Sequence, residues 1–451
     1  MAELASKDPL LPHVVILGGG FAGLTAARTL RRTPVRITIV DRRNHHLFQP
    51  LLYQVATAAL NPADIAYPIR SVLRRQANAR TILARADRID LVGRRVVLRD
   101  GDELPFDWLI VATGATHSYF GHDEWEPWAP GLKTVEDALE IRRRVLSAFE
   151  AAEREPDPER VKSMLTFVIV GGGPTGVELA GALIEIGRET VAKDFRTFDP
   201  RSLRVVLIEG ADRVLPPYSP KLSQQAKRQL DRLGVEVRVG ARVTAIDRDG
   251  VQIGSERIRA RVVLWAAGVA ASPLGRTLGV DCDRAGRVPV EPDLSVPGHP
   301  NVFVAGDLMT VQSDGKPVPG IAPAAIQAGR AAARNIARAV RGLPTLRFRY
   351  RDKGSLATIG RAAAVGRVGG VEVSGFLAWW LWWLVHIAYL IGFRNRIVVM
   401  MGWAWQYFAF SRGARLITGR GWEPEAKPPA GAPAPQPPVA AGPATAPPRG
   451  T

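Results

Sequence analysis

The stretch "HVVILGGGFAGLTAARTLRR", residues 13–32, decides the fold of the N-terminal half. An apolar run with β-strand character ends in Gly18, Gly20 and Gly23, and an Ala- and Leu-rich helical stretch follows. In a dinucleotide-binding turn the first glycine allows the tight turn, the second allows a pyrophosphate to approach, and the third allows close helix–strand packing. The phosphates then face the N-terminus of the helix. A second strand, "VRITIVD", ends at Asp41, whose carboxylate suits a ribose diol.

The same pattern recurs at "LTFVIVGGGPTGVELAGALIEI", residues 165–186, with Gly171, Gly173 and Gly176. The next strand, "LRVVLIE", ends at Glu209 after a longer interval than usual. An acid there would repel a 2′-phosphate and bind a free 2′-hydroxyl, so we expect NADH rather than NADPH. Two dinucleotide sites in one chain predict electron transfer between two cofactors.

Two further strands end in residues suited to a flavin. "FDWLIVATGAT" runs into Thr113 and Gly114, and "HPNVFVAGDLM" ends at Gly306 and Asp307. The helical stretch "GIAPAAIQAGRAAARNIARAV" follows, and its N-terminus would bring partial positive charge near a reduced flavin. Taken singly, each of these is also an ordinary strand and turn.

Composition excludes several classes of function. The 451 residues, 46% of them hydrophobic, suffice for two or three folded domains. A single cysteine, Cys282, excludes an internal disulfide or a CxxC redox pair, and no metal site is visible. The N-terminus shows no secretory signal, which favours a cytoplasmic location. Without cysteines, "NHHLFQPLLYQVATAAL", residues 44–60, cannot relay electrons through a disulfide; we expect it to shape an apolar approach to the flavin.

The order of motifs resembles that of flavoproteins with two dinucleotide-binding domains, and more narrowly the type II NADH:quinone oxidoreductases. The specific marks are residues 44–60, "VELAGAL", "VVLWAAGV" and "GSLATIGRAAAV". The resemblance implies an α/β fold with two Rossmann-like domains, for FAD and for NADH, followed by an amphipathic, membrane-associating helical region at the C-terminus. It also implies a membrane quinone, ubiquinone or menaquinone, as electron acceptor.

The resemblance also implies the site residues. FAD would be held by Gly18, Gly20, Phe21, Ala22, Gly23, Asp41, Arg42, Ala86, Ala112, Thr113, Gly114, Gly306, Asp307 and Ala324, and NADH by Gly171, Gly173, Pro174, Thr175, Gly176, Glu209 and Gly268. Glu178 matches the glutamate that the family places near flavin and nicotinamide. It also lies just inside a helix, where the helix dipole favours an acid for structural reasons. The family's AQxAxQ pattern, which the resemblance places beside the quinone, reads "APAAIQ" here, so Gln327 is retained as a candidate catalytic residue while Pro323 replaces the first glutamine.

We expect six segments along the chain: residues 1–120 and 286–345 as the two parts of the FAD domain, 121–160 as a helical connection, 161–285 as the NADH domain, 346–422 as the membrane-associating region, and 423–451 as a disordered Pro- and Ala-rich tail.

The C-terminal region predicts contact with a membrane surface. "FLAWWLWWLVHIAYLIGF", residues 376–393, is apolar apart from His386, but its tryptophans prefer the headgroup boundary and basic residues flank both ends. A second apolar stretch, "IVVMMGWAWQYFAF", follows. Residues 330–420 hold fifteen Lys and Arg against two acids, which suits anionic lipid. We expect monotopic attachment to the cytoplasmic side of the membrane. The alternatives are that the tryptophans form a core helix or the interface of a homodimer, that the basic residues form a solvated face, and that His386 is structural.

The predicted reaction is of ping-pong type: NADH gives a hydride to the flavin, and a quinone then receives two electrons without proton pumping. One rival is a soluble NADH-dependent reductase of a small redox protein, which would not need the tryptophan-rich C-terminus. The other is a flavoprotein whose basic surface binds nucleic acid. Apolar runs of this length suit lipid better than phosphate, so we expect no nucleic-acid partner.

Overall fold

The computed structural model describes residues 10–409 and 413–418. The expected disordered tail, 423–451, lies outside the described residues.

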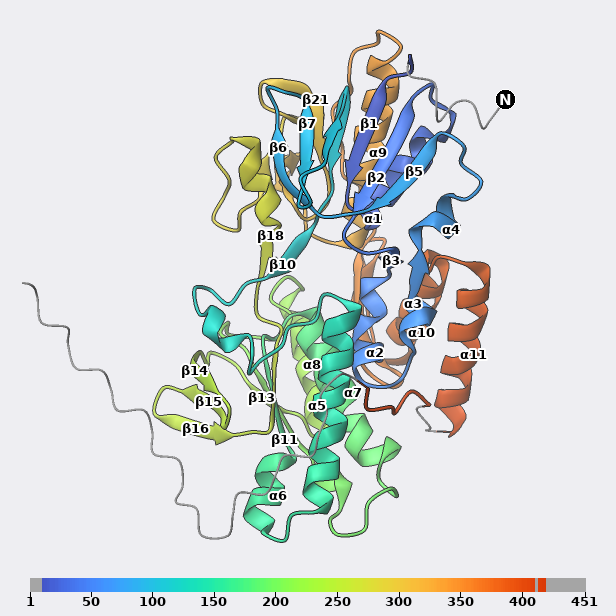
Figure 1. Cartoon of the computed structure of the whole chain (residues 1–451). Helices are drawn as coiled ribbons and strands as arrows, with labels where there is room; N and C mark the ends of the chain where they lie inside the picture. Colours follow the sequence, from blue (N-terminus) through green and yellow to red (C-terminus); the bar gives the residue numbers. More distant parts are fainter. Residues whose placement is uncertain (1–9, 410–412, 419–451) are drawn as a thin grey trace, which may run out of the picture. The chain divides into compact units, whose positions relative to one another are not determined.

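A six-stranded sheet forms the first domain, in the order β20-β21-β9-β1-β2-β5 (Figure 1). Its strands are β1 (His13–Leu17), β2 (Arg36–Asp41), β5 (Ala79–Leu83), β9 (Trp108–Val111), β20 (Ser295–Val296) and β21 (His299–Val304). All pairs are parallel except β20–β21. The central strands are buried on both faces, which explains why they read as continuous apolar runs.

Helices α1 (Phe21–Thr29) and α9 (Ala322–Ala339) pack closely together beside this sheet. A Cβ on Gly329 of α9 would lie 2.2 Å from the carbonyl oxygen of Ala22, so the close approach requires a glycine. A three-stranded sheet of β6 (Ala86–Asp90), β7 (Arg95–Leu98) and β8 (Glu103–Pro105) completes the domain, with the short strands β19 (Val288–Pro289), β22 (Met309–Thr310), β23 (Gln312–Ser313) and β24 (Lys316–Pro317).

The second domain repeats the plan with a four-stranded parallel sheet, β13-β12-β11-β17. Its elements are α5 (Val135–Glu153), α6 (Pro158–Met164), β11 (Thr166–Val170), α7 (Pro174–Glu185), β12 (Arg204–Ile208), α8 (Pro220–Leu233), β13 (Glu236–Arg238) and β17 (Val262–Trp265), with a three-stranded sheet of β14 (Val243–Asp247), β15 (Gly250–Ile253) and β16 (Glu256–Arg259). Helix α7 continues into a π-helical turn, Ile186–Thr190.

Two antiparallel strands, β10 (Ala115–His117) and β18 (Val269–Ala271), carry the chain out of the first domain and back. Ala271, Leu274 and Leu278 already pack in the core of the first domain. The chain therefore rejoins this core ahead of residue 286, where the sequence analysis places the second part of the FAD domain.

Residues 44–60 leave β2 and form part of a small helical layer. It contains β3 (His45–Leu47), α2 (Leu52–Ala56), α3 (Pro62–Ile65), β4 (Ala66–Pro68) and α4 (Ile69–Leu73). Leu51, Leu52 and Val55 are buried in the same cluster as Ile141 of α5 and Val177 of α7. The stretch thus joins the two domains.

The C-terminal region begins with a three-stranded antiparallel sheet, which the expectation of a helical region did not include. Strands β25 (Ser355–Gly360), β26 (Ala363–Val368) and β27 (Val371–Ser374) precede α10 (Gly375–Tyr389) and α11 (Phe393–Ala409). A Cβ on Gly181 of α7 would lie 1.5 Å from the carbonyl oxygen of Ile359, so β25 rests directly on α7. In the described part of the chain, no helix combines the length and the hydropathy that crossing a bilayer demands.

Candidate dinucleotide and electron-transfer site

We call the two glycine-rich turns, residues 18–23 and 171–176, the first and second fingerprints. The three glycines of the first fingerprint have the three different steric roles that the sequence predicts. Gly18 has a φ of +101°, and a Cβ there would lie 2.4 Å from the carbonyl oxygen of Ala112. A Cβ on Gly23 would lie 1.9 Å from the carbonyl oxygen of Gly18, whereas a Cβ on Gly20 would meet nothing within 4 Å. Gly18 and Gly23 therefore serve the turn and the packing, and Gly20 leaves open space at the start of α1. No side chain caps that helix.

Asp41 holds the glycine turn from the end of β2. Its Oδ2 accepts a 2.6 Å hydrogen bond from the Gly19 backbone N–H, and its Oδ1 accepts one of 2.7 Å from the N–H of Arg43. The side chain of Arg43 pairs with Glu136 at 3.2 Å, while that of Arg42 is exposed. Because each carboxylate oxygen has two acceptor positions, Asp41 can still bind a ribose hydroxyl.

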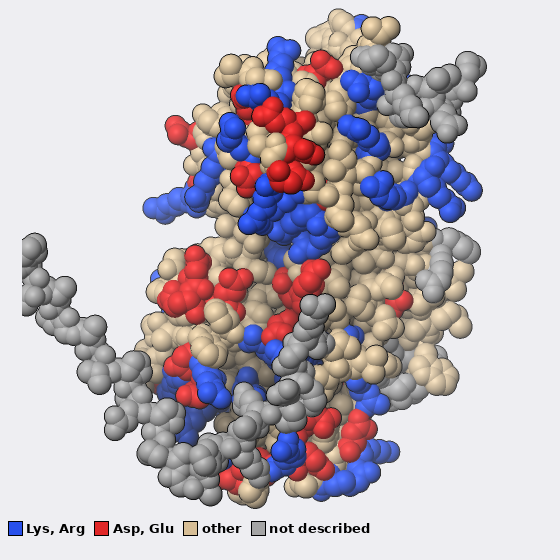
Figure 2. Space-filling view, viewed as in Figure 1, with Lys and Arg blue, Asp and Glu red and all other residues tan. Residues whose placement is uncertain are grey.

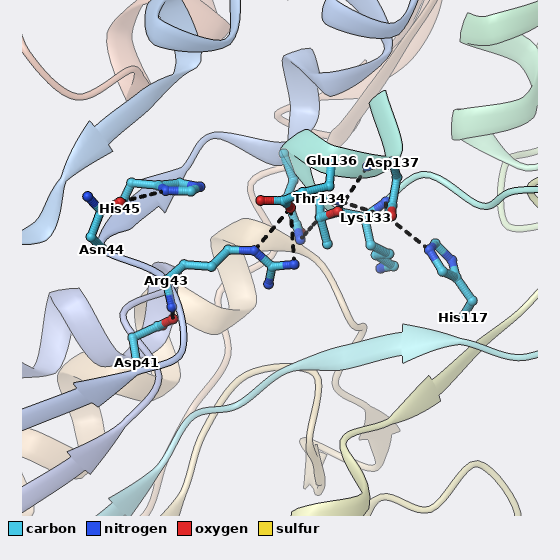
Figure 3. Close-up of polar contacts among 10 residues, drawn as sticks. Asp41, Arg43, Asn44, His45, His117, Lys133, Thr134, Glu136 and Asp137 are labelled. Carbon is cyan, nitrogen blue, oxygen red and sulfur yellow. Dashed lines mark hydrogen bonds and ion pairs between the residues drawn. The ribbon is translucent and has the colours of Figure 1, made fainter. Parts of the chain in front are cut away.

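The start of α5 is tied to this loop and to the link between the domains. Figure 3 shows Arg43 reaching Glu136, and Asp137 beside His117 of β10. Asp137 accepts a hydrogen bond from the N–H of Thr134 and one from His117 Nε2 at 3.1 Å. One carboxylate thus caps α5 and fixes the strand that leaves the first domain.

The residues expected near the riboflavin lie around the carboxyl ends of β9 and β21. Ala112 and Ala324 are buried, Gly114 and Gly306 have φ values of +67° and +83°, and Asp307 lies beside Gly320. The hydroxyl of Thr113 is buried and has no hydrogen-bond partner among the described residues. Ala86 stands half-buried at the start of β6. Parallel strands of one sheet bring these segments to one edge, where ligands bind in such folds.

These residues fit FAD. The open space at Gly20 and the uncapped start of α1 suit a pyrophosphate, and the free hydroxyl of Thr113 offers a hydrogen bond in the buried part.

The second fingerprint repeats this geometry. Gly171 has a φ of +111°, and a Cβ on Gly176 would lie 1.8 Å from the carbonyl oxygen of Gly171. Gly173 is the open position and is the N-cap residue of α7, so no side chain caps this helix. Pro174 occupies the first turn of α7, where its missing N–H is not needed, and Thr175 follows half-buried.

Glu209 acts in the second domain as Asp41 acts in the first. Its Oε2 accepts a 2.6 Å hydrogen bond from the N–H of Gly172, and its Oε1 accepts one of 2.7 Å from Ala211. Gly268 lies where the chain returns from β17, and its carbonyl accepts a hydrogen bond from Ser118. The second site therefore fits NADH. The hydrogen bonds by which Asp41 and Glu209 fix the two glycine turns could not be predicted from the sequence.

Glu178 lies on the second turn of α7, between that helix and the C-terminal sheet. Burial raises the pKa of its carboxyl well above 4.5, and an interaction with the backbone of Thr358 in β25 offsets part of that rise. Tyr218 is close by, since burial and then the charge of Glu178 raise its pKa to about 12, against a hydrogen bond with Ser355. The raised pKa favours the protonated form of Glu178, so this side chain is suited to holding or moving a proton.

Gln327 is engaged with the backbone rather than open. Its Nε2 donates to the carbonyl oxygen of Arg351 at 3.0 Å, and the N–H of Arg351 donates to its Oε1 at 3.0 Å. Pro323 occupies the first turn of α9. The side chain of Gln327 therefore joins α9 to the segment that leads to β25, and retains one N–H for a ligand.

Sequence reasoning did not single out a row of aromatic residues between the first fingerprint and α10. Phe21 packs edge-on against His46 and Phe48, at ring-centroid distances of 5.0 and 5.9 Å. Phe48 in turn meets His386 at 6.2 Å, and His386 stacks on Trp382 at 4.2 Å. The sequence indicated only one part of this row, since residues 44–60 were expected to lie beside the flavin. Their contact with α10 was not predicted.

Comparisons with known proteins agree with this geometry. The model of the pyridine nucleotide-disulphide oxidoreductases matches residues 12–329, and that of the NDH2 C-terminal domain matches residues 353–412. Two type II NADH:quinone oxidoreductases of Mycobacterium tuberculosis are similar: Ndh, 47% identical over 92% of each chain, and NdhA, 49% identical over 90% of each chain.

Solved structures show the same fold. NDH2 from Plasmodium falciparum aligns with a TM-score of 0.80 and 20% identity, over 91% of this chain and 100% of that chain. The sulfide:quinone oxidoreductase of Aquifex aeolicus aligns with a TM-score of 0.64 and 19% identity, over 88% and 95%. Together with the close sequence relatives, these findings show that the chain belongs to the type II NADH:quinone oxidoreductases, within the pyridine nucleotide-disulphide oxidoreductase family.

Proposed function

We propose that this protein takes electrons from NADH through FAD to a membrane quinone. The observation that carries the proposal is the pair of fingerprints, each with an open central glycine, an uncapped helix and an acid on the turn. Gly18, Gly20, Gly23 and Asp41 would hold FAD, and Gly171, Gly173, Gly176 and Glu209 would hold NADH. When bound, FAD supplies the chemistry that accepts a hydride and releases electrons to a second substrate.

The chain's own part is to orient the two nucleotides and to exclude water. Backbone N–H groups at the starts of α1 and α7 bind the pyrophosphates, and Asp41 and Glu209 bind the ribose hydroxyls. Glu178 holds a proton close to where the nicotinamide is expected. Its position against β25 connects it to the C-terminal region rather than to bulk solvent.

We propose that the quinone approaches along the contact between Phe48 and α10. The indole N–H of Trp382 is buried and has no hydrogen-bond partner among the described residues, so it can donate to a quinone oxygen. His386 donates from Nδ1 to the carbonyl oxygen of Trp382 at 2.6 Å, and burial lowers its pKa to about 4. The ring is therefore neutral at neutral pH, and Nε2 carries the lone pair.

The outer face of α10 and α11 supports binding to a membrane surface. Exposed apolar side chains lie along both helices: Phe376 (54%), Leu377 (61%), Leu384 (50%), Met401 (62%) and Trp405 (67%). In Figure 2 this edge of the molecule is mostly free of charged residues. A patch of this kind marks an interaction site. We propose peripheral attachment to anionic lipid on the cytoplasmic side.

The tryptophans divide between two roles. Trp382 and Trp403 are buried in the core, whereas Trp380 and Trp405 are exposed. Removal of every residue from Gly375 onward would therefore uncover the core. Single substitutions such as Leu377→Glu and Met401→Glu test the attachment better, with Leu343→Glu, on an exposed leucine outside these helices, as control. Loss of vesicle pelleting only in the first two variants is expected; unchanged pelleting would refute the attachment.

The decisive experiment follows NADH oxidation by the purified protein with and without a short-chain quinone, at the nicotinamide and flavin absorbances together. Bleaching by NADH and recovery with quinone over many turnovers are expected. Bleaching without recovery would favour the reductase of a small redox protein instead. Pull-down on lipid vesicles against DNA, at two salt concentrations, separates the membrane surface from a nucleic-acid partner.

A further inference from the structure

His46 has a buried ring nitrogen without a hydrogen-bond partner in the described part of the chain. The residue lies in the middle of β3 and is 2% exposed. One ring nitrogen, Nδ1, lies 3.0 Å from the carbonyl oxygen of Gly19. The other, Nε2, is fully buried, and no described residue bonds with it. Leaving a buried polar atom without a partner is unfavourable, so such an atom often marks the place of a bound group.

The other buried histidine of this domain is satisfied within the chain. His13 of β1 is 6% exposed, and its Nδ1 and Nε2 each lie 2.7 Å from a partner, the carbonyl oxygen of Pro105 and the hydroxyl of Thr38. His45 also has an Nε2 without a described partner, but it is only half-buried and points to the other face of β3. His46 is therefore the deeply buried histidine of this domain that needs a further partner.

The contact of Nδ1 determines where the ring carries its hydrogen. A carbonyl oxygen can only accept, so Nδ1 carries the hydrogen and donates it to Gly19. Burial lowers the pKa of His46, and this effect outweighs the opposing influence of the Gly19 carbonyl and of Asp41. The ring is therefore neutral at neutral pH, and Nε2 presents a lone pair. The partner that Nε2 needs is a hydrogen-bond donor.

The surroundings of His46 place it at the first fingerprint. Asp41 accepts a hydrogen bond from the N–H of Gly19 in this turn, and His46 donates one to the carbonyl oxygen of the same residue. Phe21, the first residue of α1, packs edge-on against the imidazole at 5.0 Å. The open position, Gly20, lies between Gly19 and Phe21 in the chain. His46 thus borders the turn where the pyrophosphate of FAD is expected.

The row of aromatic residues indicates the direction in which FAD continues from this turn. The row leads from His46 and Phe21 to Phe48, and from Phe48 to His386 of α10, where we propose that the quinone approaches. In FAD the ribitol chain joins the pyrophosphate to the flavin ring. Phosphate oxygens only accept hydrogen bonds at neutral pH, whereas ribitol hydroxyls also donate them. A ribitol hydroxyl is therefore the part of FAD that suits the lone pair of Nε2.

We propose that His46 binds FAD, with Nε2 accepting a hydrogen bond from a hydroxyl of the ribitol chain while Nδ1 holds the carbonyl oxygen of Gly19. One imidazole would then connect the pyrophosphate turn to the part of the cofactor that carries the flavin. The proposal rests on FAD at the first fingerprint, which the proposed function also requires, and not on the identity of the electron acceptor. His46 adds to the FAD-binding residues expected from the sequence, none of which lies in β3.

Two amide substitutions separate the roles of the two ring nitrogens. In His46→Asn the side-chain N–H can replace Nδ1 at Gly19, but no atom reaches the place of Nε2. In His46→Gln the longer side chain brings its amide to the place of Nε2, where the oxygen can accept from a hydroxyl. The measurement is the rate at which FAD leaves the purified yellow protein after strong dilution, followed by flavin fluorescence. We expect His46→Asn to release FAD roughly tenfold faster, as for one lost hydrogen bond, and His46→Gln to stay closer to the unchanged protein.

His122→Asn is the matched control substitution. The side chain of His122 is 50% exposed and pairs with Glu124 at 3.0 Å, outside the first fingerprint. This variant should release FAD at the rate of the unchanged protein. Melting curves with excess FAD show whether the His46 variants are folded, and both should melt cooperatively. Bleaching by NADH and recovery with quinone, measured on the unchanged protein, report separately on the proposed function.

Three outcomes would overturn the proposal. One is that His46→Asn retains FAD as well as the unchanged protein, and another is that His46→Gln releases FAD as fast as His46→Asn or faster, since the ring would then serve only Gly19 and packing. The third is FAD release that quickens as pH rises from 5 to 8 in the unchanged protein but not in His46→Gln, which would indicate a protonated ring paired with the pyrophosphate. Asp41 and His45, whose charges act on this ring, remain in both proteins and so do not affect the comparison.

Discussion

A substitution at Gly173 should weaken the binding of NADH while leaving the folding of the protein nearly unchanged. A Cβ at this position would meet nothing within 4 Å, and the backbone there is extended, with φ −70° and ψ −177°. Gly173→Ala therefore introduces no clash in the chain itself. Alanine is a poorer N-cap residue than glycine by about 1 kcal/mol, but it also restricts the unfolded chain by a similar ~0.4–1 kcal/mol. The net change in unfolding free energy should stay within about 1 kcal/mol.

The effect on NADH should be much larger. The space beside Gly173 is where the pyrophosphate must approach the N–H groups that begin α7. A methyl group there displaces the phosphate from charge-assisted hydrogen bonds worth about 1.5–3 kcal/mol each. Loss of one such bond weakens NADH binding by roughly tenfold to a hundredfold.

The assay compares the dissociation constant for NADH and the retention of the yellow flavin in the same preparation. Gly173→Ala should keep the flavin and its melting temperature while losing affinity for NADH. Gly176→Ala is the matched control, because its Cβ would lie 1.8 Å from the carbonyl oxygen of Gly171, and it should fail to fold normally. If Gly173→Ala binds NADH as tightly as the unchanged protein, the second glycine turn is not the nucleotide site.

Three further changes test the acids and the C-terminal helices. In the unchanged protein the raised pKa of Glu178 makes the folded state bind more protons than the unfolded chain, so stability should fall as pH rises above about 4.5. Glu178→Gln should abolish this loss, and melting curves from pH 5 to 8 would show it. Glu209→Gln should raise kcat/KM for NADPH relative to NADH, and an unchanged ratio would count against the role of Glu209. Trp403→Phe removes the 2.7 Å hydrogen bond to Gln54 and should lower the unfolding free energy by about 1 kcal/mol, measured by denaturant titration, with Trp405→Phe as the exposed control.

The local geometry of the nucleotide sites could be predicted closely from sequence. The roles of Gly18, Gly20 and Gly23 follow from the steric demands of one tight turn, which involve residues only a few positions apart. The same holds for the second fingerprint. Asp41 and Glu209 were also predictable, since a strand places its last residue at the carboxyl edge of a parallel sheet.

The roles of Glu178 and Gln327 could not be read in the same way. The pKa of Glu178 depends on burial beneath β25, about 180 residues further along the chain. Gln327 was expected at the quinone, but its amide bonds with the backbone of Arg351 in the structure. A side chain's partners across such separations depend on how the elements pack, and no local pattern encodes them.

By itself, then, the sequence determined the two nucleotide-binding turns, their acids and the apolar character of the C-terminal helices, because glycine spacing and hydropathy act over a few residues. Only the tertiary structure decided that a three-stranded sheet precedes those helices, and which tryptophans face inward. It also decided that Nε2 of His46 is buried without a described partner. The physical reason is that burial belongs to the packed chain as a whole: a residue's neighbours, and so its solvation and charge, come from segments that folding brings together.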